Sequence, residues 1–359
     1  MRKAVGVLEI AKLANVSLGT VDRALHNRGR VGPATRQRIL GIAQQIGYKP
    51  NLAARALSIG PNAFPVAVCV PREIHYYFDQ LRDGISLEGK HFEYLGLKLN
   101  YVSTERLGMG EKRAVQAILE QRPKALIITP GDPQLLTPLI NEAEKRNIRV
   151  VCVATDAPQS RRSAVVTLNA EVAGGVAADL LGRLGSSESQ VAVVTGMLQT
   201  EDHRRNVGAF TKVFEQACPH GKVAEVIEDH ENEDEAYGKC SRLLQENSSI
   251  TGIYVTTANC LPVCRAITTL NLSHRVQVVA SDLFLEMMPY FDMGVVAASI
   301  YGRPFAQGRV AVRVIVDSII NGGTLRPKYY VAPQVVTRSS MHLFRETQTL
   351  RAKHREAPH

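Results

Sequence analysis

The chain has 359 residues, of which 45% are hydrophobic, and it carries a formal net charge of +9 at pH 7. This length exceeds one ordinary domain and predicts two or three folded units with a real core. No apolar run reaches the roughly 18 residues that a membrane span needs, and the first residues lack the apolar segment of a signal peptide, so we expect a cytoplasmic protein with no membrane partner.

The positive charge is concentrated at one end of the chain. The first 60 residues contain ten Lys or Arg side chains but only two acidic ones, Glu9 and Asp22. The other 299 residues carry 33 basic and 32 acidic groups and are close to neutral. Because a segregated basic region attracts polyanions, and because this region also has regular apolar spacing, it predicts a nucleic-acid-binding head rather than a solubilising tail.

The basic head predicts three short helices. Residues 8–14 form a brief amphipathic segment that ends at Asn15, a residue that tolerates the left-handed backbone of a tight turn. Ser17 is a suitable N-cap for a second helix over 18–25. Pro33 fits the first turn of a third helix, where its missing N–H costs nothing.

This arrangement has the features of a helix-turn-helix, with Ala11 as the small contact residue and Asn15 as the turn residue. Apolar side chains that would pack the second helix on the first are Ile10, Ala14, Val16, Val21 and Ala24. Residues 7–25 resemble the head of the lactose/galactose repressor (LacI/GalR) family. The match continues through Val31, Thr35, Arg36, residues 46–51 and residues 54–57.

The resemblance implies that the second helix lies in the major groove of operator DNA. The positions that match base readers are Leu18, Gly19 and Arg23, and Arg23 suits bidentate contact with guanine. Phosphate contacts position such a head without reading sequence, and they would come from Ser17, Thr20, Asn27 and Asn51. Asp22 departs from the family pattern, in which Ser is usual, and we expect it to cap or pair with a neighbouring Arg. A surface salt bridge alone is the alternative role for Arg23.

Residues 51–57 match the hinge helix of that family, and they include Ala54 and Leu57. A seven-residue helix is marginal alone in water, so we expect it to form only when two copies pack together on DNA. Leu57 matches the leucine that wedges into the minor groove and bends the duplex, whereas packing against the body is the alternative. This order–disorder element would be the switch.

From Pro65 onward, short apolar runs alternate with amphipathic helices. Such alternation predicts parallel sheets covered by helices on both faces. Some ten strands are too many for one open sheet of ordinary width, so we expect an α/β body of two doubly wound lobes with a cleft between them. The predicted strands are 66–70, 98–102, 125–129, 149–153, 165–168, 190–195, 223–227, 252–256, 276–280 and 295–300.

The body resembles the periplasmic sugar-binding-protein fold that serves the family as its effector domain. The resemblance implies that Tyr77 and Phe78 stack on a sugar ring, at the strand end where parallel sheets bind ligands. Asp156 matches a strand-end acid, and Asp282 matches a late acid that receives sugar hydroxyls. Arg205 matches an Arg that hydrogen-bonds ligand hydroxyls or a carboxylate.

Other positions match the family less directly, and an ordinary structural role is the alternative for every predicted ligand contact. Asn169 matches the Asn of a motif that usually reads Asp-Asn, but the preceding residue is Leu. Either Asn259 or Thr256 matches the polar contact of that region, and Gly302 stands where relatives often carry Gln. The acidic run 228–235 is interpreted as a solvated loop that leads into a helix.

The predicted organisation is a multidomain chain with an all-α head over 1–49, a hinge and linker over 50–64, and a polar tail over 346–359. The effector domain is expected over 65–345. Its first lobe should comprise about 65–167 and 298–328, and its second lobe about 168–297 and 329–345. The tail lacks leucine heptads, so a tetramerising coiled coil is not expected.

The resemblance implies a regulator that binds a palindromic operator in double-stranded DNA as a homodimer, most often to repress sugar-uptake or catabolic genes on the bacterial nucleoid. The effector would be a sugar, a polyol or a sugar derivative. The six scattered cysteines predict buried free thiols, and no metal, cofactor or catalytic residue is expected. Alternatives are a sugar receptor without a DNA role, an activator or corepressor-dependent repressor, and a cleft enzyme.

Overall fold

The computed structural model describes residues 6–26, 29, 31–46, 48, 64–321, 325–341 and 343–344. The predicted contacts Asn27, Asn51, Ala54 and Leu57 lie outside the described residues, as do nearly all of the predicted linker and the whole polar tail. Among the described helices, none is both long and apolar enough to cross a membrane.

The head is a bundle of three helices around a small core, which confirms the predicted helix-turn-helix. Its helices are α1 (Val7–Ala14), α2 (Leu18–His26) and α3 (Pro33–Gln45). Asn15 ends α1 in the left-handed region with φ of 49°. The backbone N–H of Thr20 donates to Ser17 Oγ at 3.2 Å, as expected for an N-cap. Buried apolar side chains from all three helices form the core: Ile10, Ala11, Ala14, Val21, Ala24, Ile39 and Ala43.

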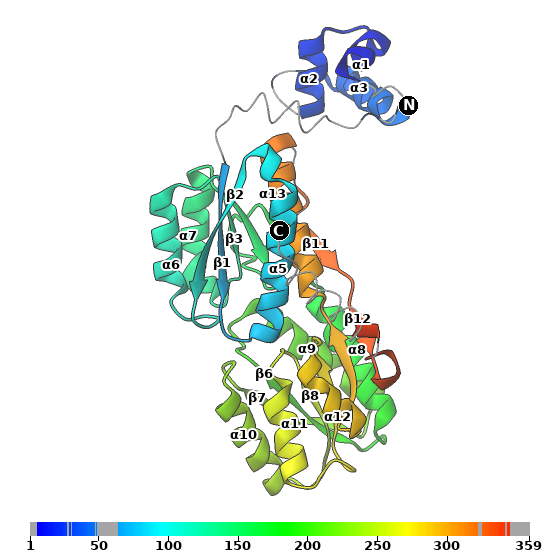
Figure 1. Ribbon diagram of the computed structural model, residues 1–359. Helices are drawn as coiled ribbons and strands as arrows, with labels where there is room; N and C mark the ends of the chain where they lie inside the picture. Colours follow the sequence, from blue (N-terminus) through cyan, green and yellow to red (C-terminus); the bar gives the residue numbers. More distant parts are fainter. Residues whose placement is uncertain are drawn as a thin grey trace.

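The body contains two six-stranded sheets, which define two lobes (Figure 1). The sheet of the first lobe is wholly parallel, with strand order β11-β5-β4-β3-β1-β2. The strands are β1 (Phe64–Pro71), β2 (Leu97–Thr104), β3 (Ala125–Ile128), β4 (Arg149–Val153), β5 (Ala164–Leu168) and β11 (Lys328–Val331).

The sheet of the second lobe has the order β12-β10-β9-β8-β6-β7, and only its edge strand β12 runs antiparallel to its neighbour. The strands are β6 (Gln190–Thr195), β7 (Lys222–Glu228), β8 (Ile250–Val255), β9 (Gln277–Ser281), β10 (Val296–Tyr301) and β12 (Gln334–Val336). This agrees with the predicted pair of doubly wound lobes.

Helices cover both faces of each sheet because successive side chains of a buried strand point to opposite faces. On β1, Val66 and Val68 belong to the core under α5 and α13, whereas Ala67 and Cys69 belong to the core under α6 and α7. In the second lobe, α8 and α9 cover one face, and α10, α11 and α12 cover the other.

The helices of the body and its three short 3-10 turns have these bounds: α5 (His75–His91), α6 (Glu111–Gln121), α7 (Pro133–Lys145), α8 (Ala170–Leu184), α9 (Glu201–Ala217), α10 (Glu233–Glu246), α11 (Cys260–Thr269), α12 (Met288–Asp292), α13 (Pro304–Asn321), η1 (Glu93–Leu95), η2 (Leu285–Met287) and η3 (Arg338–Ser340). Helices α5 and α13 approach closely at Gly84, where a Cβ atom would lie 2.1 Å from the carbonyl oxygen of Phe305. The first lobe therefore depends on glycine at this contact.

The chain passes between the lobes after β5, after β10 and after β11. The last two passages differ from those expected. Residues 298–301 pair with the second sheet, not the first, and residues 329–331 pair with the first sheet, not the second. The apolar segment 295–300 predicts a strand, but its sequence does not show which of the two sheets the strand joins.

Candidate functional site

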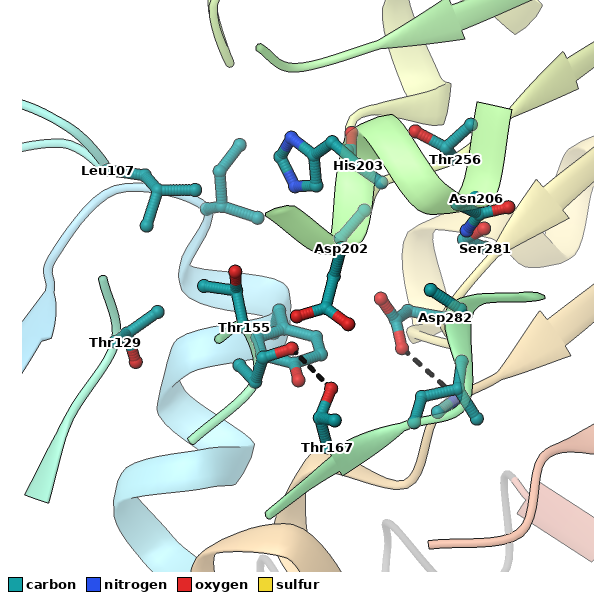
Figure 2. A pocket seen from close by; sticks show the side chains of 18 of the residues that line it. Leu107, Thr129, Thr155, Thr167, Asp202, His203, Asn206, Thr256, Ser281 and Asp282 are labelled. Carbon is teal, nitrogen blue, oxygen red and sulfur yellow. Dashed lines mark hydrogen bonds between the residues drawn. The ribbon is translucent and has the colours of Figure 1, made fainter. Parts of the chain in front are cut away.

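A cavity lies between the two lobes, at the carboxyl ends of strands from both sheets. It encloses about 750 Å³ of space not filled by protein atoms, part of which opens to solvent. Strand ends and helix starts are where parallel α/β sheets bind ligands. Polar groups that line it come from both lobes: Tyr77, Thr129, Thr155, Thr167 and Gln307 from the first, and Asp202, His203, Asn206, Glu231, Thr256, Thr257, Ser281 and Asp282 from the second. Figure 2 shows Thr129, Thr155 and Thr167 across the cavity from Asp202, His203 and Asp282.

Four of the eight predicted effector contacts line this cavity. The Tyr77 hydroxyl donates to Gln307 Oε1 at 3.2 Å, which fixes the phenol at the cavity wall. Phe78 adds an apolar ring that is also part of the first-lobe core. Thr256 Oγ1 donates to Thr195 Oγ1 at 2.7 Å, and Asp282 Oδ1 accepts from the backbone N–H of Gly302 at 3.2 Å.

The other four predicted contacts do not line the cavity, and each has a partner within the protein. Asp156 forms a buried ion pair with Arg162, with one contact of 2.7 Å. The Asn169 side chain caps α8 by accepting from two backbone N–H groups of its first turn.

The two remaining side chains are held in the same way. Arg205 pairs with Glu171 at 3.1 Å. Asn259 Nδ2 donates to Asp229 Oδ2 at 2.8 Å, and Asn259 lines a hollow that adjoins the cavity. In this structure these four side chains are bound by neighbouring groups of the protein outside the cavity.

Sequence reasoning missed the acids that the fold brings to the cavity. Asp202 and His203 stand at the start of α9, one turn before Arg205. Glu231 lies in the run interpreted as a solvated loop, but only 6% of it is exposed. The run does lead into a helix, α10, as expected, but its middle is buried against the second lobe. Asp202 lies in the first turn of a helix that also carries the predicted contact Arg205, and this spacing is a signal that could have found it.

Burial shifts the titration of the groups in the cavity. Burial, with Asp156 nearby, raises the pKa of Asp202 to about 7. Burial also raises the pKa of Asp282 to about 7, partly offset by the Gly302 hydrogen bond. The pKa of Glu231 is raised well above its ordinary value by burial and by Asp229 and Asp282. Burial lowers the pKa of His203 to about 4, so this imidazole is neutral at pH 7.

The lobes also contact one another around the cavity. Thr200 Oγ1 donates to the carbonyl of Gly131 at 2.7 Å, and the Tyr301 hydroxyl donates to Gln80 Oε1 at 2.8 Å. The rings of Tyr76 and Phe284 stack with centroids 4.2 Å apart. Each pair joins one side chain or backbone group of the first lobe to one of the second. A change in the angle between the lobes would break these contacts.

The predicted DNA contacts that fall in the described residues lie close together in the chain, at the start of α2. Ser17, Leu18, Gly19 and Arg23 are exposed on or before α2, and Thr20 is half-buried between them. The Arg23 guanidinium donates to Thr20 Oγ1 at 3.4 Å. This segment carries the cation suited to guanine and the hydroxyls suited to phosphate.

Two family models match the chain. Residues 7–51 match the model "Bacterial regulatory proteins, lacI family", and residues 66–323 match the model "Periplasmic binding protein domain". The chain belongs to the LacI family of bacterial regulatory proteins. Within that family its head is the LacI domain and its body is the periplasmic-binding-protein domain. All six of its cysteines are free and buried, as predicted.

Curated relatives of this LacI-family chain are also regulators. The repressor PurR of Aliivibrio salmonicida is 21% identical over 94% of this chain and 98% of that protein. Catabolite control protein A of Priestia megaterium is 23% identical over 70% of this chain and 74% of that protein. The regulator AscG of Escherichia coli is 31% identical, but over only 34% of this chain and 36% of its own length.

Solved structures share the fold of the LacI-family body. The glucose-galactose binding protein GanP of Geobacillus stearothermophilus has a TM-score of 0.71 and 23% identity, covering 78% of this chain and 99% of that one. A solute-binding protein of Burkholderia graminis, solved with D-arabinose, has a TM-score of 0.72 and 20% identity, covering 78% and 97%. At these identities the likeness establishes the architecture of the two lobes.

Proposed function

We propose that this chain is a repressor that binds a palindromic operator as a homodimer, and that a small polyhydroxylated ligand in the interlobe cavity changes its affinity for DNA. One observation carries the proposal: a basic helix-turn-helix head, whose second helix exposes Arg23, and a polar cavity between two lobes occur in one chain of the LacI family. The ligand-binding residues that we propose are Tyr77, Phe78, Thr256 and Asp282, with Asp202, Asn206, Glu231 and Gln307. We place its action in the bacterial cytoplasm, on the nucleoid.

The coupling follows from linkage. Contacts such as Thr200 to Gly131 and Tyr301 to Gln80 hold the lobes at one angle. A ligand that touches both lobes favours the angle at which all of its contacts form. If the two heads meet DNA correctly at only one angle, the ligand changes DNA affinity by its differential affinity for the two arrangements. Induction and corepression differ only in which arrangement the ligand favours.

The test starts from the purified full chain and a random duplex library, because the operator is chosen by the protein. Rounds of selection should enrich an inverted repeat, and sedimentation should show two chains on each selected duplex. A thermal-shift screen of sugars and polyols should then find a ligand, since stabilisation grows with occupancy. Enrichment of no symmetric sequence would overturn the dimeric reading of the operator.

A free sugar receptor is the second candidate, because the solved structures with this fold include sugar-binding proteins. It predicts ligand binding without any sequence preference for DNA. Arg23→Ala separates the two candidates: it should remove the preference for the selected duplex and leave ligand binding unchanged. The charge-matched control is Arg242→Ala, which removes an exposed arginine of α10 in the body.

A further inference from the structure

The cavity wall carries three acids and no cation. Among the described residues, Asp202, Glu231 and Asp282 line it, and neither Lys nor Arg does. His203 also lines the cavity, and burial keeps it neutral at pH 7 by lowering its pKa to about 4. An anionic ligand would therefore find no positive side chain in the wall, whereas a cation would favour the ionised form of the acids.

Several polar atoms of the cavity wall are poorly satisfied, and two of them belong to these acids. Among the described residues, four cavity-lining residues have a buried side-chain oxygen with no well-formed hydrogen bond: Thr129, Thr155, Asp202 and Glu231. Asp202 and Glu231 are only 9% and 6% exposed. The hydroxyls of Thr155 and Thr257 lie near these two carboxyl groups and lower the pKa of each by hydrogen bonding. Because a carboxylate can accept about four hydrogen bonds and an unused buried acceptor is costly, the cluster has acceptor capacity for a ligand that brings donors.

The arginines near the cavity are paired with other acids. Arg162 is held by Asp156, and Arg205, whose charge lowers the pKa of Asp202, is paired with Glu171 at 3.1 Å. Charge neutralisation of the cavity acids must therefore come from protons or from the ligand itself.

An adjoining hollow has an excess of acidic side chains. It shares Ile74, Glu231 and Ala258 with the cavity, and it is also lined by the acids Glu73, Glu233 and Asp234 and by the basic residues Arg106 and His75. Arg106 is already paired with Glu73. An approach lined by one sign of charge raises the local concentration of ligands of the opposite sign.

We propose that the ligand is a polyhydroxylated compound with a protonated amine, such as an amino sugar, whose ammonium is bound by the carboxylates of Asp202, Glu231 and Asp282. The ammonium supplies three donors to a site with unpaired acceptors, and its hydroxyls meet the threonines. Tyr77 and Phe78 supply the aromatic wall for the ring. This inference rests on the proposed function in one respect only, namely that the interlobe cavity is the effector site.

The test uses matched sets in which only the charge differs: D-glucosamine, D-glucose and D-glucuronate, and the corresponding galacto and manno compounds. Calorimetry on the full chain should show, in at least one set, that the amine binds more tightly than the neutral sugar by about tenfold or more, equivalent to about 1.4 kcal/mol. The acid of that set should not bind. Tighter binding of a neutral sugar or an acid, or binding of no amine in any set, would overturn the proposal.

Variants locate the charge preference. Asp202→Asn and Glu231→Gln keep the shape of each side chain and should reduce the preference for the amine over the neutral sugar. Asp179→Asn, at an exposed position of α8, is the control and should leave that preference unchanged. An amine preference that survives in the double variant Asp202→Asn/Glu231→Gln would show that these acids do not carry it.

The outcome separates this inference from the proposed function. A neutral sugar that binds and changes DNA affinity would leave the regulatory proposal standing and remove the amine. An amine that binds with the predicted preference but leaves DNA affinity unchanged would support the amine ligand and contradict the regulatory proposal.

Discussion

Replacing Asp282 by Asn tests whether the buried carboxyl group of Asp282 destabilises the folded chain when it ionises. Burial raises the pKa of Asp282 from 3.8 to about 7 in the folded chain. Between those values the folded state holds a proton that the unfolded state has lost, so the stability contributed by this group is complete below pH 4 and is lost as pH rises toward 7. Asn does not titrate, and its Oδ1 can keep the hydrogen bond from Gly302.

The magnitude follows from the size of the pKa change. One pKa unit corresponds to about 1.4 kcal/mol, so the free energy of unfolding of Asp282→Asn relative to wild type should rise by about 2–4 kcal/mol between pH 4.5 and pH 8. Urea unfolding followed by circular dichroism at the two pH values measures this difference directly. Groups that do not interact with Asp282 affect both proteins alike and cancel in the comparison, whereas Glu231, whose pKa Asp282 helps to raise, adds to the difference in the same direction.

Asp179→Asn is the matched control, because Asp179 is exposed on α8. Its free energy of unfolding relative to wild type should be nearly the same at both pH values. The reasoning is refuted if Asp282→Asn also keeps a constant offset from wild type, since the acid would then ionise in the folded state at no cost.

Three further substitutions probe the reader and the scaffold. Arg23→Ala should lower the preference for the selected operator over random DNA by about 1–3 kcal/mol, measured by fluorescence anisotropy, whereas equal weakening on both duplexes would mean that it contacts only phosphate. Ala14→Leu, at a position 1% exposed, should overpack the head by about 1–3 kcal/mol and abolish DNA binding with ligand binding intact; retained operator affinity would contradict the packing. Gly84→Ala should lower the melting temperature because its Cβ meets the backbone of α13. Its control is Gly208→Ala, which has open space around it in α9 and should stabilise the chain by up to about 1 kcal/mol. Equal shifts of the melting temperature in calorimetry would refute the close approach of α5 and α13 at Gly84.

Most of the fold can be predicted from the sequence, because the local preferences for turns, helices and strands agree with the tertiary structure. Asn15 and Ser17 define the turn and the second helix of the head, and the apolar runs of the buried strands locate ten of the twelve strands in the described residues. The two missing strands, β11 and β12, are short and half-exposed, so they lack a continuous apolar run. The sheet that each of these strands joins depends on pairing between residues far apart in the chain, and hydrophobic periodicity does not predict such pairing.

The cavity is less accessible to sequence reasoning. Family resemblance selects Tyr77 and Asp282, which line the cavity in the structure, but it does not show that Arg205 forms an ion pair with Glu171. Glu231 stands in a run of acids whose composition resembles a solvated surface, and only the packing of the second lobe reveals that it is buried. Such pairings depend on residues far apart in the chain.

The central claim is that the cavity and the reading head are energetically coupled, and reciprocal titration tests it most directly. The affinity of the full chain for its selected operator is measured with and without saturating ligand, and the affinity for the ligand is measured with and without saturating operator. Linkage predicts that both affinities change by the same factor, about 5- to 150-fold, and that Asp282→Ala loses the effect of the ligand on operator affinity. Ligand binding that leaves operator affinity unchanged would contradict the account.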